Sequence, residues 1–219
     1  MTESKGWNWS IVSDNYWKIP SIDSYYLLNR WINQNKKNIL DLGCGVGRHS
    51  ILFALNNFYV YSFDISEVGI DETKKWSEEL NLSNIDFKVG DMLSLPYEDN
   101  SIDSIICYNV ISHSDTIGVV NVIQEIKRVL KHDGEAFITL CSKETWGYKQ
   151  DWPKIDENTL LKMEEGPEYK VPHFYADYNL VKELFKDFEI IDVRHIQDFF
   201  SSNNKEYSSY HFHILIKKK

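Results

Sequence analysis

Three aspartates and a run of alternating glycines are the residues of this chain whose type and spacing could bind a ligand. Residues 41–47 read DLGCGVG and follow a short apolar run. Glycine at every second position predicts a tight turn through which the backbone can approach a ligand. Asp41 stands two residues before the first glycine, where its charge would repel a pyrophosphate and attract an ammonium group. The spacing also differs from the Gly-x-Gly-x-x-Gly of dinucleotide-binding folds.

The other two aspartates follow predicted strands. Residues 59–63 form a largely apolar run that ends at Asp64, and alternating apolar residues at 85–89 lead to Asp91. Ligands of parallel sheets bind beyond the carboxyl ends of the strands, so three strands that end in aspartate would gather three carboxylates there. A cationic ligand with hydroxyls and an adenine amine would explain all three. Either residue alone could instead cap the turn that follows it.

Strand and helix patterns alternate in the first two thirds of the chain. Strands are predicted at 38–42, 59–63, 85–89, 102–107 and 136–140, with helices at 48–56, 66–80 and 116–130. This order predicts an α/β fold of the Rossmann-like, doubly wound type, in which helices cover both faces of a mostly parallel sheet. In the helix that Ser66 caps, Val68, Trp76 and Leu80 are expected to share the buried face.

The last part of the chain predicts two further strands, which makes seven. A helix at 179–188 leads to a strand at 189–196, and a polar loop at 201–209 leads to a final strand at 210–216. The loop is too short to hold a crossover helix, so the final strand is expected to run antiparallel to its neighbour. The sequence contains no internal repeat and no linker, and residues 1–219 are interpreted as a single domain.

The glycine turn and the strand-end aspartates resemble the first motifs of class I S-adenosylmethionine-dependent methyltransferases. The resemblance covers roughly residues 36–141, and residues 128–138 (RVLKHDGEAFI) are similar to the family's common approach to the fifth strand. The chain departs from that pattern at His132 and Asp133, where a proline and a glycine often stand. The resemblance implies S-adenosyl-L-methionine as the cofactor of a methyltransferase domain.

The resemblance also implies a role for each matching residue. Asp41 and the glycine backbone would meet the amino-acid end of the cofactor, Asp64 the ribose hydroxyls and Asp91 the adenine amine. Arg48 has a surface position on its helix as the alternative, and Cys44 is interpreted as a small packing residue and not as a nucleophile. The implied cofactor-binding residues are Asp41, Gly43, Cys44, Gly45, Gly47, Arg48, Asp64, Ile65, Asp91, Met92, Tyr108 and Asn109, the last two beneath the sulfonium.

Two aromatic regions are the candidates for the substrate side. Residues 142–176 interrupt the alternation with a long insertion, which is expected to cover a substrate pocket because such insertions are usually functional. Residues 1–35 are expected to form a lid and a helix before the first strand. Packing on the sheet or on the surface is the alternative for each ring. The predicted substrate-side residues are Trp17, Trp146, Tyr148, His173 and Tyr175.

His113, just past the fourth strand, is the candidate for acid–base chemistry. The family often places its substrate there, so His113 is predicted to act as a general base or to contact the acceptor. The alternative is a structural histidine that caps the turn at Asp115. His211 and His213 share a face of the last strand, but they lack a third ligand at a readable spacing, and no metal site is expected.

Composition limits the partners and the compartment. The formal net charge of −9 over 219 residues argues against nucleic acid or an anionic membrane as a partner. The three cysteines lie far apart and predict buried, reduced thiols. No segment resembles a signal peptide or approaches the roughly 20 apolar residues that cross a bilayer. These features predict a cytoplasmic protein and leave its oligomeric state open.

The functional prediction is therefore an S-adenosylmethionine-dependent methyltransferase with an unidentified small-molecule acceptor and an in-line displacement. One alternative is a nicotinamide-dependent oxidoreductase on a related fold, against which the glycine spacing and Asp41 count. The other is a non-catalytic module that binds S-adenosylmethionine and transfers nothing. The aromatic insertion favours a second ligand and hence an enzyme.

Overall fold

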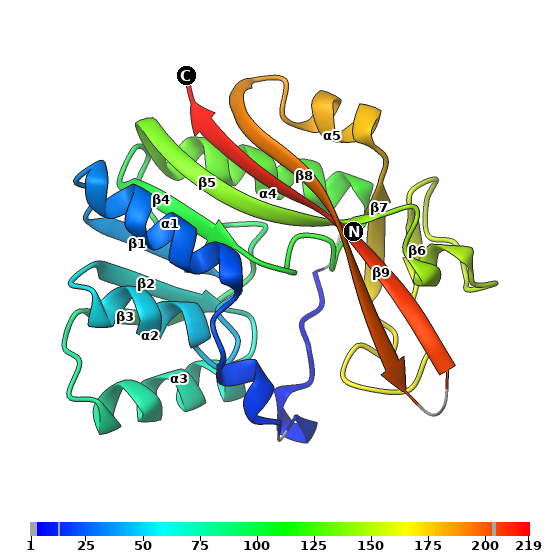
Figure 1. Ribbon diagram of the computed structural model, residues 1–219, viewed down its shortest axis with the longest axis horizontal. Helices are drawn as coiled ribbons and strands as arrows, with labels where there is room; N and C mark the ends of the chain where they lie inside the picture. Colours follow the sequence, from blue (N-terminus) through cyan, green and yellow to red (C-terminus); the bar gives the residue numbers. More distant parts are fainter. Residues whose placement is uncertain (1–3, 13, 203–204) are drawn as a thin grey trace.

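The computed structural model describes residues 4–12, 14–202 and 205–219, and within these ranges one sheet carries helices on both faces (Figure 1). The strands are β1 (Asn38–Leu42), β2 (Tyr59–Asp64), β3 (Ile85–Val89), β4 (Ile102–Cys107), β5 (Leu130–Ser142), β6 (Thr159–Leu161), β7 (Pro172–Ala176), β8 (Phe188–Ser202) and β9 (Lys205–Lys218). The α-helices are α1 (Ile22–Asn33), α2 (Arg48–Leu55), α3 (Glu67–Glu79), α4 (Thr116–Val129) and α5 (Tyr178–Leu184). Short 3-10 helices are η1 (Trp9–Ile11), η2 (Asn15–Lys18) and η3 (Trp146–Lys149).

The strand order places the glycine turn at the centre of the sheet. The order is β3-β2-β1-β4-β5-β7-β6, with β9 paired to β5 and β8 paired to β9. Strands β1 to β5 run parallel, and their order reverses between β1 and β4. Ligands of open α/β sheets bind at such a reversal, beyond the carboxyl ends of the strands. The predicted fold class is confirmed.

Alternation along the strands produces two hydrophobic cores. On β1, Leu40 and Leu42 pack with α4 and α5 on one face, while Ile39 packs with α1 and α2 on the other. On β5, Ile138 and Phe137 divide between the same two cores. Side chains of a strand point to opposite faces in turn, so a strand that is apolar on both faces must be covered on both.

Within the described residues the sheet has nine strands, where the sequence predicted seven. The two additional strands, β6 and β7, lie in the insertion. β5 continues to Ser142, beyond its last pair with β4 at Ile138, and β7 pairs in parallel with the end of β5 through Cys141 and Tyr175. β6 adds to β7 in antiparallel orientation. The insertion is therefore attached to the sheet by backbone pairing, which its irregular apolar pattern did not indicate.

The predicted loop at 201–209 is wrong. Residues 201–202 and 205–209 belong to a long hairpin of β8 and β9, and residues 203–204 lie outside the described residues. The hairpin extends beyond the body of the sheet in Figure 1. Its outer part is polar, so backbone hydrogen bonds and not an apolar pattern define the strands there. The antiparallel orientation of the last strand against β5 is confirmed.

The buried face of α3 also differs from the prediction. Ser66 caps the helix as predicted, with its Oγ accepting from the Gly69 amide at 3.2 Å. However, Val68 and Leu80 are exposed, and the side that packs inward carries small residues such as Thr73 and Ser77. Small residues let α3 approach the glycine turn closely. Among the described residues, no helix combines the length and the apolar character needed to cross a membrane.

Candidate functional site

The glycine turn joins β1 to α2 at the reversal point of the sheet. Gly43, Gly45 and Gly47 have φ values of 72°, 55° and 90°, in the left-handed region that favours glycine. A Cβ added to Gly43 would lie 2.3 Å from Val110 Cγ2, so a side chain has no room there. The Gly43 amide donates to the Phe63 carbonyl at 2.7 Å and fixes the turn to the end of β2. The turn therefore needs these glycines both for its backbone shape and for its close packing.

Asp64 ends β2 directly beside this turn. Its Oδ2 accepts from the Gly45 amide and its Oδ1 from the Ser66 amide, each at 2.8 Å. Each carboxylate oxygen has a second lone pair, so Asp64 retains the capacity to accept two hydroxyl groups. Burial raises the pKa of Asp64, while these backbone hydrogen bonds act in the opposite direction. The arrangement fits a ligand with two neighbouring hydroxyls, such as a ribose.

Asp41 is buried at the end of β1, with 2% of its surface exposed. Ser50 Oγ donates to its Oδ2 at 2.6 Å. Burial raises the pKa of Asp41 to about 6, although the Ser50 hydrogen bond and the charge of Arg48 lower it. A buried carboxylate whose hydrogen-bond donor is a hydroxyl gains from a cationic partner. The site thus fits the amino-acid end of S-adenosylmethionine.

Asp91 and Ile65 lie beneath an N-terminal strap, which we define as residues 4–12 and 14–18. Ser4 Oγ donates to Asp91 Oδ1 at 2.6 Å, and the Leu93 amide donates to the same oxygen at 2.9 Å. A Cβ added to Gly6 would lie 2.4 Å from Ile65 Cγ2, so the strap backbone packs directly on Ile65. In this structure, a strap hydroxyl therefore occupies Asp91 in the way predicted for the adenine amine.

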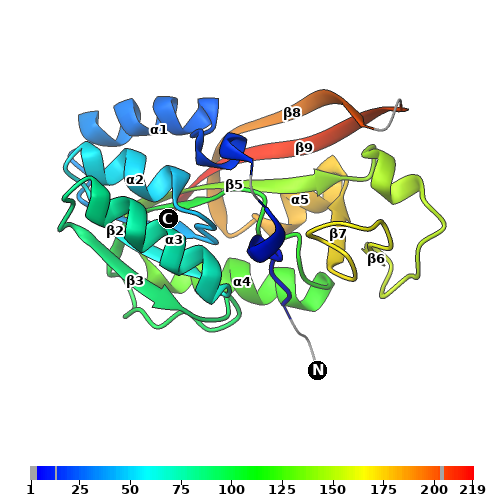
Figure 2. The same ribbon diagram turned by 90° about the horizontal axis from the view of Figure 1, so that it is seen from below.

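Three tryptophans of the strap form a cluster over the glycine turn. The Trp17 ring lies edge-on to Trp7, with centroids 4.4 Å apart, and 5.9 Å from Trp9. A Cβ added to Gly45 would lie 2.4 Å from Trp9 Cζ2, and the Arg48 guanidinium stacks 5.6 Å from the Trp17 ring. In Figure 2 the strap crosses between α3 and the loops around β6. Trp17 and Arg48 are thus brought together beside the turn.

Tyr108 and Asn109 follow the end of β4, as expected. The Tyr108 ring lies 5.1 Å from the Arg48 guanidinium and stacks on Phe137, and burial raises its pKa to about 12. Asn109 is exposed with φ of 60°, and its amide donates to Thr139 Oγ1 at 2.6 Å. The neighbouring strand β5 therefore positions the exposed Asn109 at the carboxyl edge of the sheet.

Cys44 and Met92 are buried, with 5% and 6% of their surfaces exposed. Burial raises the pKa of the Cys44 thiol well above its usual value, and the charges of Asp64 and Asp41 add to this effect. A thiol in this environment stays protonated and is a poor nucleophile. The side chains of both residues therefore serve packing, and any contribution of Cys44 to a ligand comes from the turn backbone.

His113 belongs to a second polar cluster, together with His173 and Glu168. Glu168 Oε1 lies 3.2 Å from His113 Nε2 and 3.5 Å from His173 Nε2. Trp7 Nε1 of the strap donates to the same oxygen at 2.5 Å, and Lys162 pairs with the other oxygen. His113 and His173 were both predicted site residues, but Glu168 was not, because Glu164 and Glu165 beside it resemble a solvated charge run.

Burial sets the charge state of this cluster. It lowers the pKa of His113, while the hydrogen bond to Glu168 raises it. Burial alone would raise the pKa of Glu168, but hydrogen bonds from His113 and His173 hold it well below the usual value. The cluster consequently combines a carboxylate with a neutral His113 at neutral pH. That combination can accept a proton or coordinate a cation.

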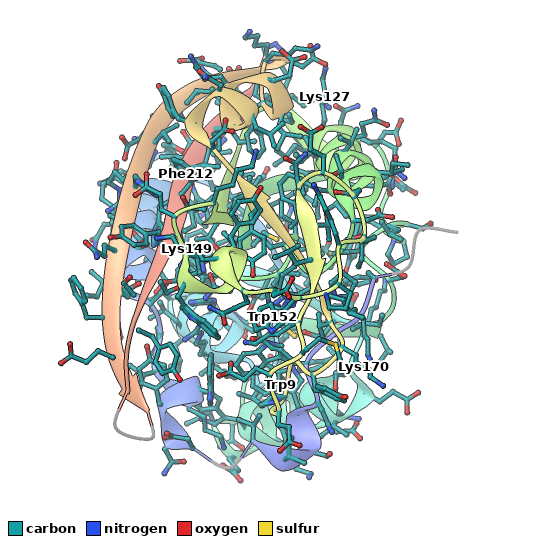
Figure 3. All side chains as sticks on the ribbon, turned by 90° about the vertical axis from the view of Figure 1, so that its right-hand side faces the viewer. Trp9, Lys127, Lys149, Trp152, Lys170 and Phe212 are labelled. Atoms are coloured by element: carbon teal, nitrogen blue, oxygen red, sulfur yellow. The ribbon has the colours of Figure 1, made fainter. Side chains whose placement is uncertain are left out.

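The predicted aromatic residues of the insertion gather beside this cluster. Tyr148 and Tyr175 have centroids 5.2 Å apart, and the Tyr175 ring lies 6.3 Å from His173. Trp146 packs between Trp152 and the hairpin residue Tyr207. Figure 3 views this end of the molecule, with Trp152 on the insertion and Trp9 of the strap on the same side. Tyr175 is fully buried, so its side chain lies beneath the surface and does not form an exposed side of a pocket.

His211 and His213 have different environments. His213 Nδ1 lies 2.7 Å from Asp23 Oδ2, and Asp23 also pairs with Arg194, which makes His213 a structural link between β9 and α1. Burial lowers the pKa of His211 to about 4.

Asp115 caps α4 through its own side chain, which accepts from the Gly118 amide at 2.7 Å. The alternative role of His113 at this turn is therefore taken by Asp115 itself.

The fold and the site together define the class. A mostly parallel sheet with a left-handed glycine turn at its reversal point, and an aspartate at the carboxyl end of each of three strands, is the arrangement of a class I S-adenosylmethionine-dependent methyltransferase. A family model described as a methyltransferase domain matches residues 33–208, and the chain belongs to that family. The predicted class is confirmed, with S-adenosylmethionine as its cofactor.

Two curated relatives and one solved structure illustrate the similarity. An uncharacterized protein of Methanocaldococcus jannaschii, MJ0638, is 29% identical over 158 residues, which are 72% of this chain and 56% of the relative. The demethylmenaquinone methyltransferase of Listeria welshimeri is 28% identical over 152 residues, 64% of this chain and 63% of the relative. The chain thus spans less than two thirds of either relative. A crystal structure of a Methanosarcina mazei S-adenosylmethionine-dependent methyltransferase superposes with a TM-score of 0.70 at 22% identity, over 85% of this chain and 96% of that one.

Proposed function

We propose that this chain is an active enzyme that transfers a methyl group from S-adenosylmethionine to a small-molecule acceptor by in-line displacement. The observation that carries the proposal is that the N-terminal strap contacts both the strand-end aspartates and the His113 cluster. Ser4 contacts Asp91, and Trp7 contacts Glu168. Ser4 and Trp7 are three residues apart, and three residues of chain extend at most about 11 Å. The strand ends around Asp91, which we call the cofactor region, therefore lie next to the cluster around Glu168, which we call the acceptor region.

The cofactor region supplies directed contacts. Asp64 would accept two ribose hydroxyls with its free lone pairs, and Asp41 would balance the ammonium group. The turn backbone, with Arg48 at the start of α2, would surround the amino-acid end. Asp91 and Ile65 would receive the adenine once the strap moves aside. Each of these assignments is a proposal for one residue that its own substitution can test.

The acceptor region supplies alignment and exclusion of water. When bound, S-adenosylmethionine provides an electrophilic methyl group, so the chain mainly needs to orient a nucleophile toward it. The tryptophan cluster of the strap would exclude water from the reacting groups. His113 would contact the acceptor, or accept its proton where the acceptor has a high pKa. Tyr148, Trp146 and His173 would line the acceptor side, with Tyr175 beneath them.

The relatives support a small-molecule acceptor. The Listeria relative is a demethylmenaquinone methyltransferase, and demethylmenaquinone is a small molecule. The net charge of −9 agrees with an acceptor that is not nucleic acid. A cytoplasmic location and one domain over residues 1–219 belong to the same proposal. The nicotinamide-dependent alternative has less support, because the family match and the glycine spacing both favour S-adenosylmethionine.

Formation of S-adenosylhomocysteine is the test of this function. The full chain is incubated with S-adenosylmethionine and a panel of small acceptors that carry phenol, thiol, amine or quinol groups. We expect acceptor-dependent release of S-adenosylhomocysteine and one methylated product by mass spectrometry. Tight cofactor binding without release on any acceptor would favour the non-catalytic module. Oxidation of NADH by the chain would favour the oxidoreductase.

A further inference from the structure

The cluster of His113, Glu168 and His173 has the geometry of a metal site. The three ligand atoms, two imidazole Nε2 atoms and one carboxylate oxygen, all lie within 4.8 Å of one another. Ligand atoms about 2.1 Å from an ion, at angles of 90–110°, are separated by about 3.0–3.4 Å. The two measured separations from Glu168 Oε1, 3.2 and 3.5 Å, are close to that spacing. The two imidazole nitrogens, which lie within 4.8 Å of each other, would move together around an ion bound to Glu168 Oε1.

The second ring nitrogen of His173 supports this interpretation. His173 Nδ1 lies 3.1 Å from the Val171 carbonyl, and only an N–H at Nδ1 makes that contact favourable. In the neutral imidazole, Nε2 then presents a lone pair to Glu168 Oε1. Two acceptors that face each other need a proton or a cation between them. A backbone carbonyl that orients the ligating imidazole is also the usual environment of a metal-bound histidine.

The surroundings of Glu168 complete the site. Lys162 holds its Oε2, so Glu168 would bind an ion through Oε1 only, the oxygen that also accepts from the Trp7 indole N–H. Lys162 also lies 3.7 Å from Glu164 Oε2, and this second carboxylate offsets its charge. Glu168, Glu164 and Lys162 together leave one net negative charge beside the two imidazoles, which a divalent cation would offset.

We propose that His113, His173 and Glu168 bind a divalent transition-metal ion such as Zn²⁺, which holds the methyl acceptor. Two histidines and one carboxylate, with further positions open, form a set typical of catalytic zinc and of non-haem iron. This proposal rests on the proposed methyltransferase function. The ion would take over the activation of the acceptor, because His113 Nε2 cannot hold a metal and a proton together.

The step balances without a further reactant. An acceptor X–H loses its proton to solvent when its heteroatom coordinates the ion, which lowers its pKa. The lone pair of X then forms a bond to the methyl carbon, and the carbon–sulfur bond breaks with its electron pair moving to sulfur. The products are X–CH₃ and a neutral thioether, and the oxidation state of the metal does not change. Thiols, phenols and other acidic hydroxyls are the acceptors suited to this chemistry.

Zinc binding to the full chain, stripped with a chelator and free of a polyhistidine tag, tests the site. Isothermal titration with ZnCl₂ is expected to give one ion per chain for the wild type. Glu168→Gln and His173→Ala should each weaken binding by more than about 100-fold, since they remove a ligand itself. Glu165→Gln is the matched control, because it alters an exposed carboxylate of the same insertion that does not belong to the cluster, and it should bind zinc as the wild type does. Circular dichroism confirms that each variant is folded.

The Co²⁺-substituted protein gives a second readout. Its visible absorption spectrum should change when His173 is replaced and stay unchanged in Glu165→Gln. Zinc binding that survives in both Glu168→Gln and His173→Ala would overturn the proposal, as would no binding to the folded wild type. S-adenosylhomocysteine binding and methyl transfer are measured on the same stripped samples. If S-adenosylhomocysteine binding and methyl transfer persist in a chain that does not bind zinc, the metal proposal fails and the proposed function stands. If the chain binds zinc but neither binds S-adenosylhomocysteine nor transfers a methyl group, the proposed function fails and the metal site stands.

Discussion

The cofactor region and the acceptor region of this protein are assembled in different ways. The proposed cofactor residues from Asp41 to Met92 come from three successive strand ends, and the sheet itself brings them together. The acceptor cluster joins His113, two residues of the insertion and Trp7, which is 161 positions from Glu168. Regular backbone pairing positions the first region, whereas side chains from distant segments position the second. Substitutions should therefore separate binding of the cofactor from turnover.

The largest effect is expected at Asp64. Asp64→Ala removes an acceptor for two hydroxyls, and hydrogen bonds to charged groups contribute about 1.5–3 kcal/mol each. The dissociation constant for S-adenosylhomocysteine should rise by more than about 100-fold. Asp71→Asn, on the exposed side of α3, is the control and should change nothing. An unchanged constant for a folded Asp64→Ala protein would remove the ribose assignment.

His113 should give the opposite pattern. His113→Gln keeps a polar side chain but loses the group that accepts a proton or binds an ion, so turnover should fall by about 100-fold. The affinity for S-adenosylhomocysteine should stay within twofold of the wild type, because His113 lies in the acceptor region. Steady-state kinetics on the acceptor found in the panel, with titration of the cofactor product, measure both. A comparable loss of cofactor affinity would show that the two regions are not separate.

Replacement of Asp41 should stabilise the fold and weaken cofactor binding, and both effects should depend on pH. Its pKa is raised from 3.8 to about 6 by burial, so its charged form destabilises the fold increasingly as pH rises through that interval. The cost at neutral pH is about 3 kcal/mol. Asp41→Asn should therefore raise Tm by roughly 6–12 °C at neutral pH.

The same substitution has two internal controls. The gain in Tm should disappear below pH 3.8, where Asp41 is protonated in both the folded and the unfolded chain. Cofactor affinity of the wild type should fall as pH drops through about 6, since the ammonium group loses its partner, and Asp41→Asn should lack this dependence. A Tm difference that is independent of pH would exclude the buried charge as its cause.

The smallest effect is expected at Trp9, which packs on Gly45 from the strap. Trp9→Phe should change cofactor affinity only a few-fold, because the remaining tryptophans still cover the turn. It should nevertheless remove much of the fluorescence change that accompanies binding of S-adenosylhomocysteine. Trp152→Phe, in the insertion, should leave that change intact. Equal signals from the two variants would mean that the strap does not respond to the cofactor.

The same contrast explains what could be predicted from the sequence. Strand ends at Asp41, Asp64 and Asp91 were predictable because apolar alternation and glycine spacing are local signals. The strands at 172–176 and 159–161 were not, because the first pairs with the end of β5 that extends beyond β4 and the second pairs with the first. The outer hairpin around 201–209 was missed since its polar residues pair through the backbone.

Side-chain partners were the least predictable part. Glu168 meets His113 only after the insertion folds back onto the end of β4, where the Phe174 amide donates to the Ser112 carbonyl at 2.8 Å. The face of α3 was mispredicted because its close packing uses Thr73 and Ser77 instead of large apolar residues. Neither the Glu168–His113 contact nor the packing of small residues on α3 produces a periodic pattern in the sequence. His113 was nevertheless selected, since its place after β4 is itself a local feature.

Calorimetric titration of the folded wild-type chain with S-adenosylhomocysteine tests whether the chain binds the cofactor at the glycine turn. We expect one binding site per chain, and competition by S-adenosylmethionine for that same site. It also predicts that NADH neither binds there nor displaces the ligand. Absence of binding by a chain whose circular dichroism and cooperative melt show it to be folded would contradict the cofactor region, and with it the proposed methyl transfer.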